Sequence, residues 1–316
     1  MRTSTFRLPV PDNGRDAVEL HVRRWDANGE PRAVVQLAHG MAEHSGRYAR
    51  VAEVLTEAGI TVFANDHRGH GETAMAPGDL GYFADSGGWQ RVVDDLYCLR
   101  QHIAAELPEL PHVMFGHSMG SFMVQDYLFS HGSTDAVVLS GTNQGSWALA
   151  RFAVGVASVE RLRLGPRGRS ALIKKLSTGD YNRRSEGRTE FDWLSRDTEQ
   201  VDRYIADPLC GFDFTVQGWI DIFTGLGRIG TEANVRRVPK LPVYLFAGSD
   251  DPVGRYGKGV EQVVEAYRRA GLDDVTHRIY EAGRHEMLNE INRDEVERDL
   301  VAWLERTVER HRQRAA

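Results

Sequence analysis

A serine flanked by glycines two places away on each side is the clearest chemical signal in the chain. Gly116, Ser118 and Gly120 form the pattern G-x-S-x-G, within a stretch that reads HVMFGHSMGS from 112 to 121. A serine hydroxyl attacks a carbonyl carbon only if it stands clear of its own strand, so the chain must turn sharply at this residue. Such a turn leaves no room for side chains at the two flanking positions. The spacing therefore predicts a nucleophile elbow with Ser118 as the attacking group.

The residues on either side of Ser118 fit a strand before the turn and a helix after it. Residues 113–115 are apolar, and the apolar residues between 122 and 128 recur at helical spacing. The alternative is a glycine-rich turn whose serine only hydrogen-bonds to backbone, which is the more frequent meaning of the bare pattern. The strand and helix context favours the catalytic interpretation.

A serine nucleophile needs a base to take its proton and an acid to orient that base. Both should follow strands, because the loops after parallel strands converge on one crevice. The apolar run 243–247 is followed by Asp250 and Asp251, and the run 275–280 is followed by a loop that contains His285. His285 is the one histidine of 12 on the loop after the last predicted strand, so we expect it to be the base. Either aspartate could supply the acid.

The attack generates an oxyanion that two backbone N–H groups must stabilise. One donor should be the residue after the nucleophile, Met119, and the other should come from the loop after the strand 33–38, where Met41 is our choice.

Several histidines near glycines invite a metal interpretation, which we reject. The potential ligands are the histidines His39, His44, His67 and His70, together with Glu43. A histidine within a tight glycine turn more often fixes the loop by hydrogen bonding, and no set of three or four ligands converges in the sequence. We therefore expect no metal and no cofactor.

Short apolar runs alternate with helical patterns along most of the chain. The runs 33–38, 60–64, 113–115, 136–139 and 243–247 are typical of strands covered on both faces, and the helical patterns cover 48–58, 90–107, 121–130, 259–271 and about 294–310. Before them, residues 6–10 and 17–25 predict an antiparallel pair joined by a turn at 12–14. The alternation predicts an α/β fold with a mostly parallel sheet.

The alternation breaks between residues 141 and 241. A gap of this length is far beyond the usual loop of about 2 to 6 residues in such a sheet, so it predicts a helical insertion seated over the carboxyl ends of the strands. We expect the core to comprise 1–145 and 239–316, and the cap to comprise 146–238.

Composition excludes several classes of protein. The formal charge of −6 and a pI near 6.1 argue against nucleic acid as a partner. Cys98 and Cys210 are too few for a disulfide framework or a metal site. No secretory leader and no long apolar run is apparent, so we expect a soluble, cytoplasmic protein and leave its oligomeric state open.

Several longer stretches resemble the monoacylglycerol lipase and lysophospholipase branch of the α/β-hydrolases. They read HGMAEHSGRY at 39–48, DHRGHG at 66–71, GHSMGS at 116–121, GSDD at 248–251 and RHE at 284–286. The resemblance implies an α/β-hydrolase fold with an eight-stranded sheet, helices on both faces and a helical cap. The chain departs from the usual pattern at Ala42, where the family has glycine, and at Thr73, where serine is common.

The resemblance also implies roles for individual residues. It points to Ser118 as nucleophile, His285 as base, and Met41 and Met119 as oxyanion donors. The family's acid usually stands three residues after the glycine of its loop, which from Gly248 is Asp251. Pro252 supports this choice, since it restrains the backbone of Asp251 to an extended conformation.

The cap should decide which substrate is hydrolysed, since the same three side chains serve many reactions. Leu149, Phe152 and Val156 lie at helical spacing and predict either a substrate wall or a face packed on the core. Residues 151–190 contain ten Arg and Lys and four Asp and Glu. This basic, partly apolar segment predicts contact with anionic lipid surfaces. The alternative is a charged face exposed to solvent, which is the more frequent explanation of such a charge run.

The favoured function is hydrolysis of carboxylic esters with an apolar acyl chain, of monoacylglycerol or lysophospholipid type. A thioesterase or an aminopeptidase with the same residues is the alternative among enzymes, because any acyl transfer uses this machinery. A protein that binds a ligand under its cap without catalysis is the alternative of a different class.

Overall fold

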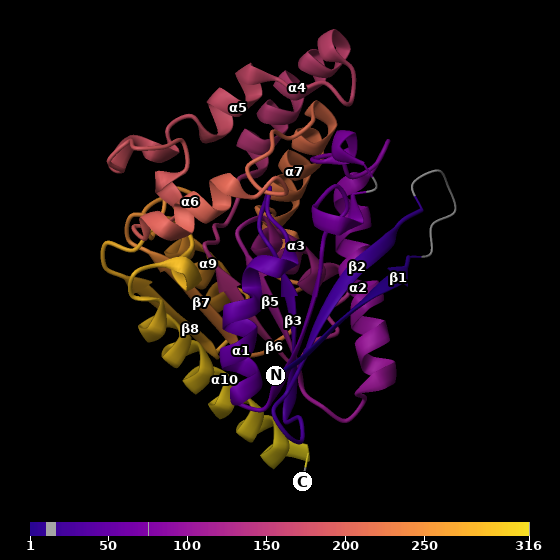
Figure 1. Ribbon diagram of the computed structural model, residues 1–316, viewed down its shortest axis with the longest axis vertical. Helices are drawn as coiled ribbons and strands as arrows, with labels where there is room; N and C mark the ends of the chain where they lie inside the picture. Colours follow the sequence, from indigo (N-terminus) through magenta and orange to yellow (C-terminus); the bar gives the residue numbers. More distant parts are fainter. Residues whose placement is uncertain (11–16, 75, 316) are drawn as a thin grey trace.

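A computed structural model describes residues 1–10, 17–74 and 76–315, and it contains one eight-stranded sheet (Figure 1). The strand order is β1-β2-β4-β3-β5-β6-β7-β8. The strands β3 to β8 run parallel, and β2 is antiparallel to both β1 and β4. Their bounds are β1 Arg2–Pro9, β2 Glu19–Asp26, β3 Ala33–Ala38, β4 Ile60–Asn65, β5 His112–His117, β6 Ala136–Ser140, β7 Val243–Gly248 and β8 Val275–Tyr280.

Helices cover both faces of this sheet. One core cluster joins the sheet to α1 Ala49–Glu57 and α10 Arg293–Ala315, and another joins it to α2 Gly88–Glu106, α3 Met119–Ser130 and α9 Lys258–Arg269. Every residue of β3 to β7 is buried, as the apolar runs predicted. The α/β fold class and the mostly parallel sheet are therefore confirmed.

Two sequence-based boundaries differ from the structure in a consistent way. The helix predicted from 121 begins at Met119, directly after Ser118, and the one predicted from 90 begins at Gly88. Glycine near a helix start lowers local helix propensity, which displaced the prediction inward. The turn predicted at 12–14 lies outside the described residues, and the strands it was expected to join do pair.

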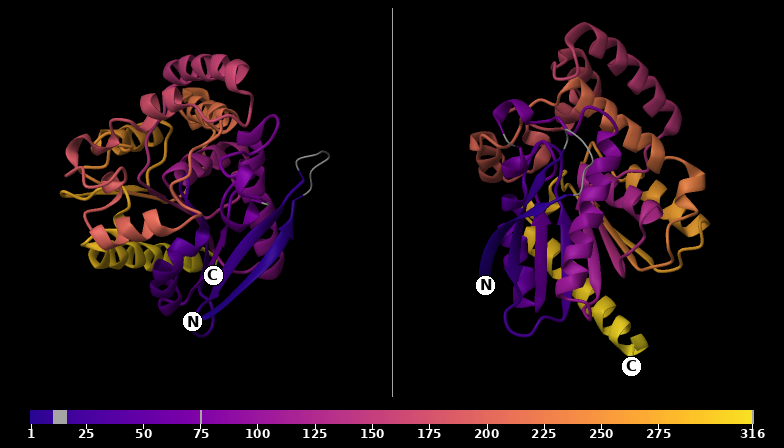
Figure 2. Two further views of the ribbon diagram at one scale, coloured as in Figure 1. Left: turned by 45° about the horizontal axis from the view of Figure 1, so that its top comes forward. Right: turned by 90° about the vertical axis from the view of Figure 1, so that its right-hand side faces the viewer.

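The long segment between β6 and β7 is helical and lies beyond the carboxyl ends of the parallel strands (Figures 1 and 2). It contains α4 Trp147–Leu164, α5 Ala171–Thr178, α6 Thr198–Ala206, α7 Val216–Ile229 and α8 Glu232–Val235. The helix α7 is attached to the core, because Arg228 forms an ion pair of 2.6 Å with the buried Asp126 of α3. In the described part of the chain, no helix combines the length and the apolar character that a membrane crossing requires.

Candidate active site

Ser118 stands in a sharp turn between β5 and α3. Its backbone has φ 52° and ψ −121°, a conformation that residues other than glycine rarely adopt. A Cβ at Gly116 would lie 2.5 Å from the carbonyl oxygen of Gly120, and a Cβ at Gly120 would lie 2.1 Å from that of Ala38. The two glycines are therefore required by close backbone approach, which is the reason the sequence pattern has them.

Ser118, His285 and Asp251 form a continuous chain of hydrogen bonds. The Ser118 Oγ lies 2.8 Å from His285 Nε2, and His285 Nδ1 lies 2.9 Å from Asp251 Oδ1. Three different strands deliver these side chains, since Ser118 follows β5, Asp251 follows β7 and His285 follows β8. With Nδ1–H donating to the carboxylate, Nε2 is free to accept the serine proton.

The structure distinguishes the two neighbouring aspartates. Asp251 is fully buried and also accepts a hydrogen bond of 2.9 Å from the backbone N–H of Val253. The side chain of Asp250 is 41% exposed and faces the guanidinium of Arg184 at 3.7 Å. Of the two aspartates, only Asp251 contacts the imidazole.

The environment of His285 makes it a stronger base. Burial alone would lower the pKa of the imidazole, but the Asp251 carboxylate, helped by Glu286 and Glu43, outweighs this effect, and the pKa is raised above its ordinary value. Glu286 itself stays ionised, because the Arg47 guanidinium overcomes the cost of burial and lowers the pKa of that carboxyl to about 2.

Met41 and Met119, the expected oxyanion donors, both line the cavity that contains Ser118. Met119 is the first residue of α3, where backbone N–H groups have no acceptor within the helix. Glu43 fixes the loop of Met41: its carboxylate accepts from the N–H of Gly40 at 2.5 Å and from the Tyr48 hydroxyl at 2.8 Å.

Arg47 connects this loop to the loop of His285. Its guanidinium lies 2.6 Å from Glu43 and 2.7 Å from both carboxylate oxygens of Glu286. No sequence pattern indicates this bridge, because Arg47 and Glu286 are more than 200 residues apart in the chain.

Ala42 adopts a left-handed backbone conformation, with φ 55°, at the position where the related pattern has glycine. This conformation is unfavourable for alanine by about 1 kcal/mol. Three hydrogen bonds hold it: Ala42 N–H donates to His70 Nε2, and its carbonyl accepts from Gly211 N–H and the Tyr204 hydroxyl. The loop therefore keeps its shape without glycine.

The buried histidines hold loops together, as the sequence predicted. His39 Nε2 accepts from the N–H of His67 at 3.0 Å, and burial lowers the pKa of His67 to about 4 and that of His70 to about 3. His44, Asp207 and Cys210 bring three potential ligand atoms within 4.8 Å of one another. Both ring nitrogens of His44 are already hydrogen bonded, so we assign no metal there.

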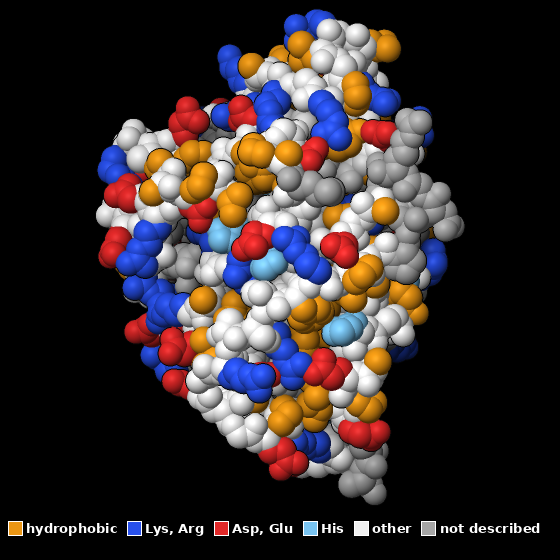
Figure 3. Space-filling model, turned by 45° about the vertical axis from the view of Figure 1, so that its right-hand side comes forward, with side chains coloured by type: hydrophobic (Ala, Val, Ile, Leu, Met, Phe, Trp, Pro, Cys, Tyr) orange, Lys and Arg blue, Asp and Glu red, His pale blue; other side chains and the backbone are white. Residues whose placement is uncertain are grey.

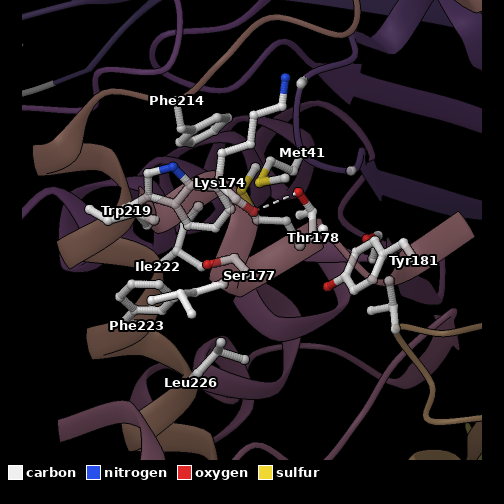
Figure 4. Close-up of a pocket in the computed structure, with 18 of the residues that line it drawn as sticks. Met41, Lys174, Ser177, Thr178, Tyr181, Phe214, Trp219, Ile222, Phe223 and Leu226 are labelled. Atoms are coloured by element: carbon white, nitrogen blue, oxygen red, sulfur yellow. Dashed lines mark hydrogen bonds between the residues drawn. The ribbon is translucent and has the colours of Figure 1, made fainter. Parts of the chain in front are cut away.

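A cavity of about 1420 Å³ is lined by Ser118 and His285. Figure 4 shows other residues that line it. Trp219, Ile222, Phe223 and Leu226 of α7 form an apolar wall, and Lys174, Ser177 and Thr178 of α5 contribute polar groups. The spacing of the α7 residues is helical and could have revealed this wall from the sequence.

Leu149, Phe152 and Val156 also line the cavity. The alternative of a face packed on the core is wrong for two of them, because Leu149 is 67% and Phe152 is 69% exposed. The reason is that α4 packs on α7 through a neighbouring face, where the small residues Ala150 and Ala157 are buried.

Known proteins resemble this chain over most of its length. Residues 29–292 match the family described as serine aminopeptidase, S33. A monoacylglycerol lipase of Mycolicibacterium smegmatis is 32% identical over 89% of this chain and 90% of its own length. The human monoglyceride lipase is 29% identical over 87% of this chain and 82% of its own length.

Solved structures of esterases and lipases superpose on nearly the whole chain. A thermostable carboxyl esterase from Bacillus coagulans superposes with a TM-score of 0.88 at 30% identity, covering 98% of this chain and 99% of that protein. A monoacylglycerol lipase from Paleococcus ferrophilus superposes with a TM-score of 0.70 at 27% identity, covering 92% and 99%.

Proposed function

We propose that this protein cleaves monoacylglycerols or lysophospholipids through an acyl-enzyme on Ser118. The basis is that the chain belongs to the serine aminopeptidase S33 family of α/β-hydrolases and is a carboxylic ester hydrolase. The observation that carries this proposal is the hydrogen-bonded chain of Ser118, His285 and Asp251 at the floor of a largely apolar cavity.

The proposed reaction has two halves. His285 accepts the proton of Ser118 as its oxygen attacks the ester carbonyl, and the N–H groups of Met41 and Met119 receive the oxyanion. His285 then protonates the departing alcohol. Water, activated by the same imidazole, releases the fatty acid and restores Ser118.

The buried carboxylates of the cavity favour an ester over an aminoacyl substrate. An aminopeptidase must bind a free ammonium group, for which it needs an available carboxylate. Glu43 and Glu286, the buried acidic residues of the cavity, are both held by the Arg47 guanidinium. The other two acidic lining residues, Glu190 and Asp213, are exposed and share Lys174.

A panel of dissolved esters of graded chain length, beside thioesters and aminoacyl amides, tests this function. Burial of each added acyl methylene contributes about 0.8 kcal/mol of binding free energy, so kcat/KM should rise about fourfold per methylene until the cavity is filled and then fall. Ala153→Trp, which fills the α4 side of the cavity, should move the maximum to shorter chains.

Ala148→Trp is the matched control, because Ala148 is exposed on the same helix and does not line the cavity. A flat chain-length profile, or a preference for aminoacyl amides, would contradict the proposed substrate class.

Activity should depend on pH through His285. The base must be neutral, so kcat/KM is expected to fall as the pH drops through the raised pKa of His285, above the ordinary histidine value of 6.5. Glu286 titrates near 2 and cannot produce this limb. A pH profile of kcat/KM for a non-ionising ester measures it, and an acid limb at or below pH 6.5 would contradict the arrangement.

We also propose that residues 146–238 act as a cap that touches lipid surfaces. Apolar side chains are exposed on α4 and α5, and basic ones lie beside them at the top of the view in Figure 3. The exposed apolar residues are Trp147, Leu149, Phe152, Val159, Leu162, Leu172 and Leu176. A basic face with exposed apolar side chains is suited to an anionic lipid surface. We also propose a cytoplasmic location, because Cys98 and Cys210 are free thiols, as is usual in a reducing compartment.

Leu162→Glu should weaken binding to vesicles that contain phosphatidylglycerol by about tenfold or more, because Leu162 is 90% exposed and a buried leucine contributes about 1.5 to 3 kcal/mol. Hydrolysis of a dissolved short ester should not change, since Leu162 does not line the cavity. Ile291→Glu, an equally drastic change at a 62% exposed site outside the cap, is the control for a vesicle sedimentation assay. Equal effects of the two variants would refute lipid contact through the cap.

A further inference from the structure

Tyr181 extends into the cavity from a short turn that is tied to the histidine loop. Asn182, the next residue, donates to the carbonyl of Thr189 at 2.7 Å and accepts from the N–H of Trp193 at 2.9 Å. The following segment is hydrogen bonded in turn to the histidine loop, since His285 N–H donates to the carbonyl of Trp193. The position of Tyr181 is thus fixed relative to His285.

The rings confirm this proximity. The centroids of Tyr181 and Trp193 are 4.8 Å apart in an edge-to-face arrangement, and those of Trp193 and His285 are 5.1 Å apart. Figure 4 shows Tyr181 across the cavity from Trp219, Phe223 and Leu226, which form the apolar wall.

The hydroxyl of Tyr181 has no hydrogen-bond partner among the described residues. Burial, together with the charge of Asp251, raises its pKa, so the hydroxyl stays protonated and can donate. A phenol that lines a largely apolar cavity is expected to find a partner when the cavity is occupied.

The reaction geometry indicates which part of a substrate Tyr181 would meet. The oxygen of the leaving alcohol must sit beside His285 Nε2, which protonates it, and the acyl chain extends along the apolar wall. Tyr181 lies on the side of His285 and away from that wall, which is the side of the alcohol.

We infer that the hydroxyl of Tyr181 hydrogen-bonds a free hydroxyl of the substrate's alcohol, and so favours esters of polyols over esters of simple alkanols. This assignment rests on the proposed ester hydrolysis, and it adds a specificity-determining residue from the segment between α5 and α6.

The test compares two esters that share the octanoyl chain and a three-carbon alcohol: monooctanoylglycerol below its critical micelle concentration and propyl octanoate below its solubility limit. Tyr181→Phe keeps the ring on Trp193 and removes only the hydroxyl. We expect kcat/KM for the glyceryl ester to fall about fivefold or more and that for the propyl ester to change less than about twofold, as for one lost hydrogen bond. Tyr256→Phe is the matched control, because Tyr256 stacks under Arg184 nearby but does not line the cavity.

An unchanged ratio of the two kcat/KM values in Tyr181→Phe would overturn the assignment, and so would an equal loss on both esters, which would indicate a structural role. Failure of the unmodified protein to hydrolyse either ester would instead contradict the proposed function, so the two failures are distinguishable.

Discussion

Ser118→Ala is expected to lower kcat for ester hydrolysis by a factor on the order of 10⁵ to 10⁶, or roughly 7 to 8 kcal/mol of transition-state stabilisation. The reason is that the Ser118 Oγ forms the covalent bond to the acyl group in the proposed mechanism. This oxygen lies 2.8 Å from His285 Nε2. What remains should be the contribution of the oxyanion donors and of binding, roughly 10³ to 10⁴ above the rate in water.

Steady-state hydrolysis of an aryl ester measures this effect. Ser158→Ala is a suitable control, because Ser158 is exposed on α4 and bonds only to its own helix. Activity of Ser118→Ala within tenfold of the unmodified protein would show that another group performs the attack.

Asp251→Asn is expected to lower kcat by about 10⁴, or about 5.4 kcal/mol, while Asp250→Asn changes it by less than about tenfold. Asp251 is buried and accepts the hydrogen bond from His285 Nδ1, and an amide in its place stabilises the wrong tautomer of the imidazole. Asp250 is partly exposed and faces Arg184, so its loss affects a surface ion pair.

Both variants carry the same chemical change at adjacent positions, so each is the control for the other. Circular dichroism must show that both are folded. The reverse ranking of the two kcat values would contradict the role of Asp251 and leave Ser118 and His285 in place.

The sheet and the three central side chains could be predicted because their signals are local. Buried strands such as 33–38 and 243–247 are short continuous apolar runs, and the elbow at Ser118 has fixed glycine spacing. The choice between Asp250 and Asp251 was open from the residues alone, since it depends on where each side chain points. The family resemblance favoured Asp251, the aspartate that contacts His285 in the structure.

The rest of the site depends on contacts between distant segments. Arg47 meets Glu286, and Asn182 positions Tyr181 through contacts with Thr189 and Trp193, without any repeating pattern in the sequence. The cap shows the same limit: Phe152 has the spacing of a packed residue but is 69% exposed, because α4 uses its small residues to pack on α7. A helical stripe indicates one face of a helix and does not say what covers it.

The central claim is that Ser118 forms the acyl-enzyme, and reaction with an alkyl fluorophosphonate tests it most directly. The reagent should add once per chain, and peptide mapping by mass spectrometry should place the adduct on Ser118, with activity lost in proportion to labelling. Ser118→Ala should take up no label. Ester hydrolysis that persists in fully labelled protein, or an adduct on any other residue that accounts for the lost activity, would contradict the account.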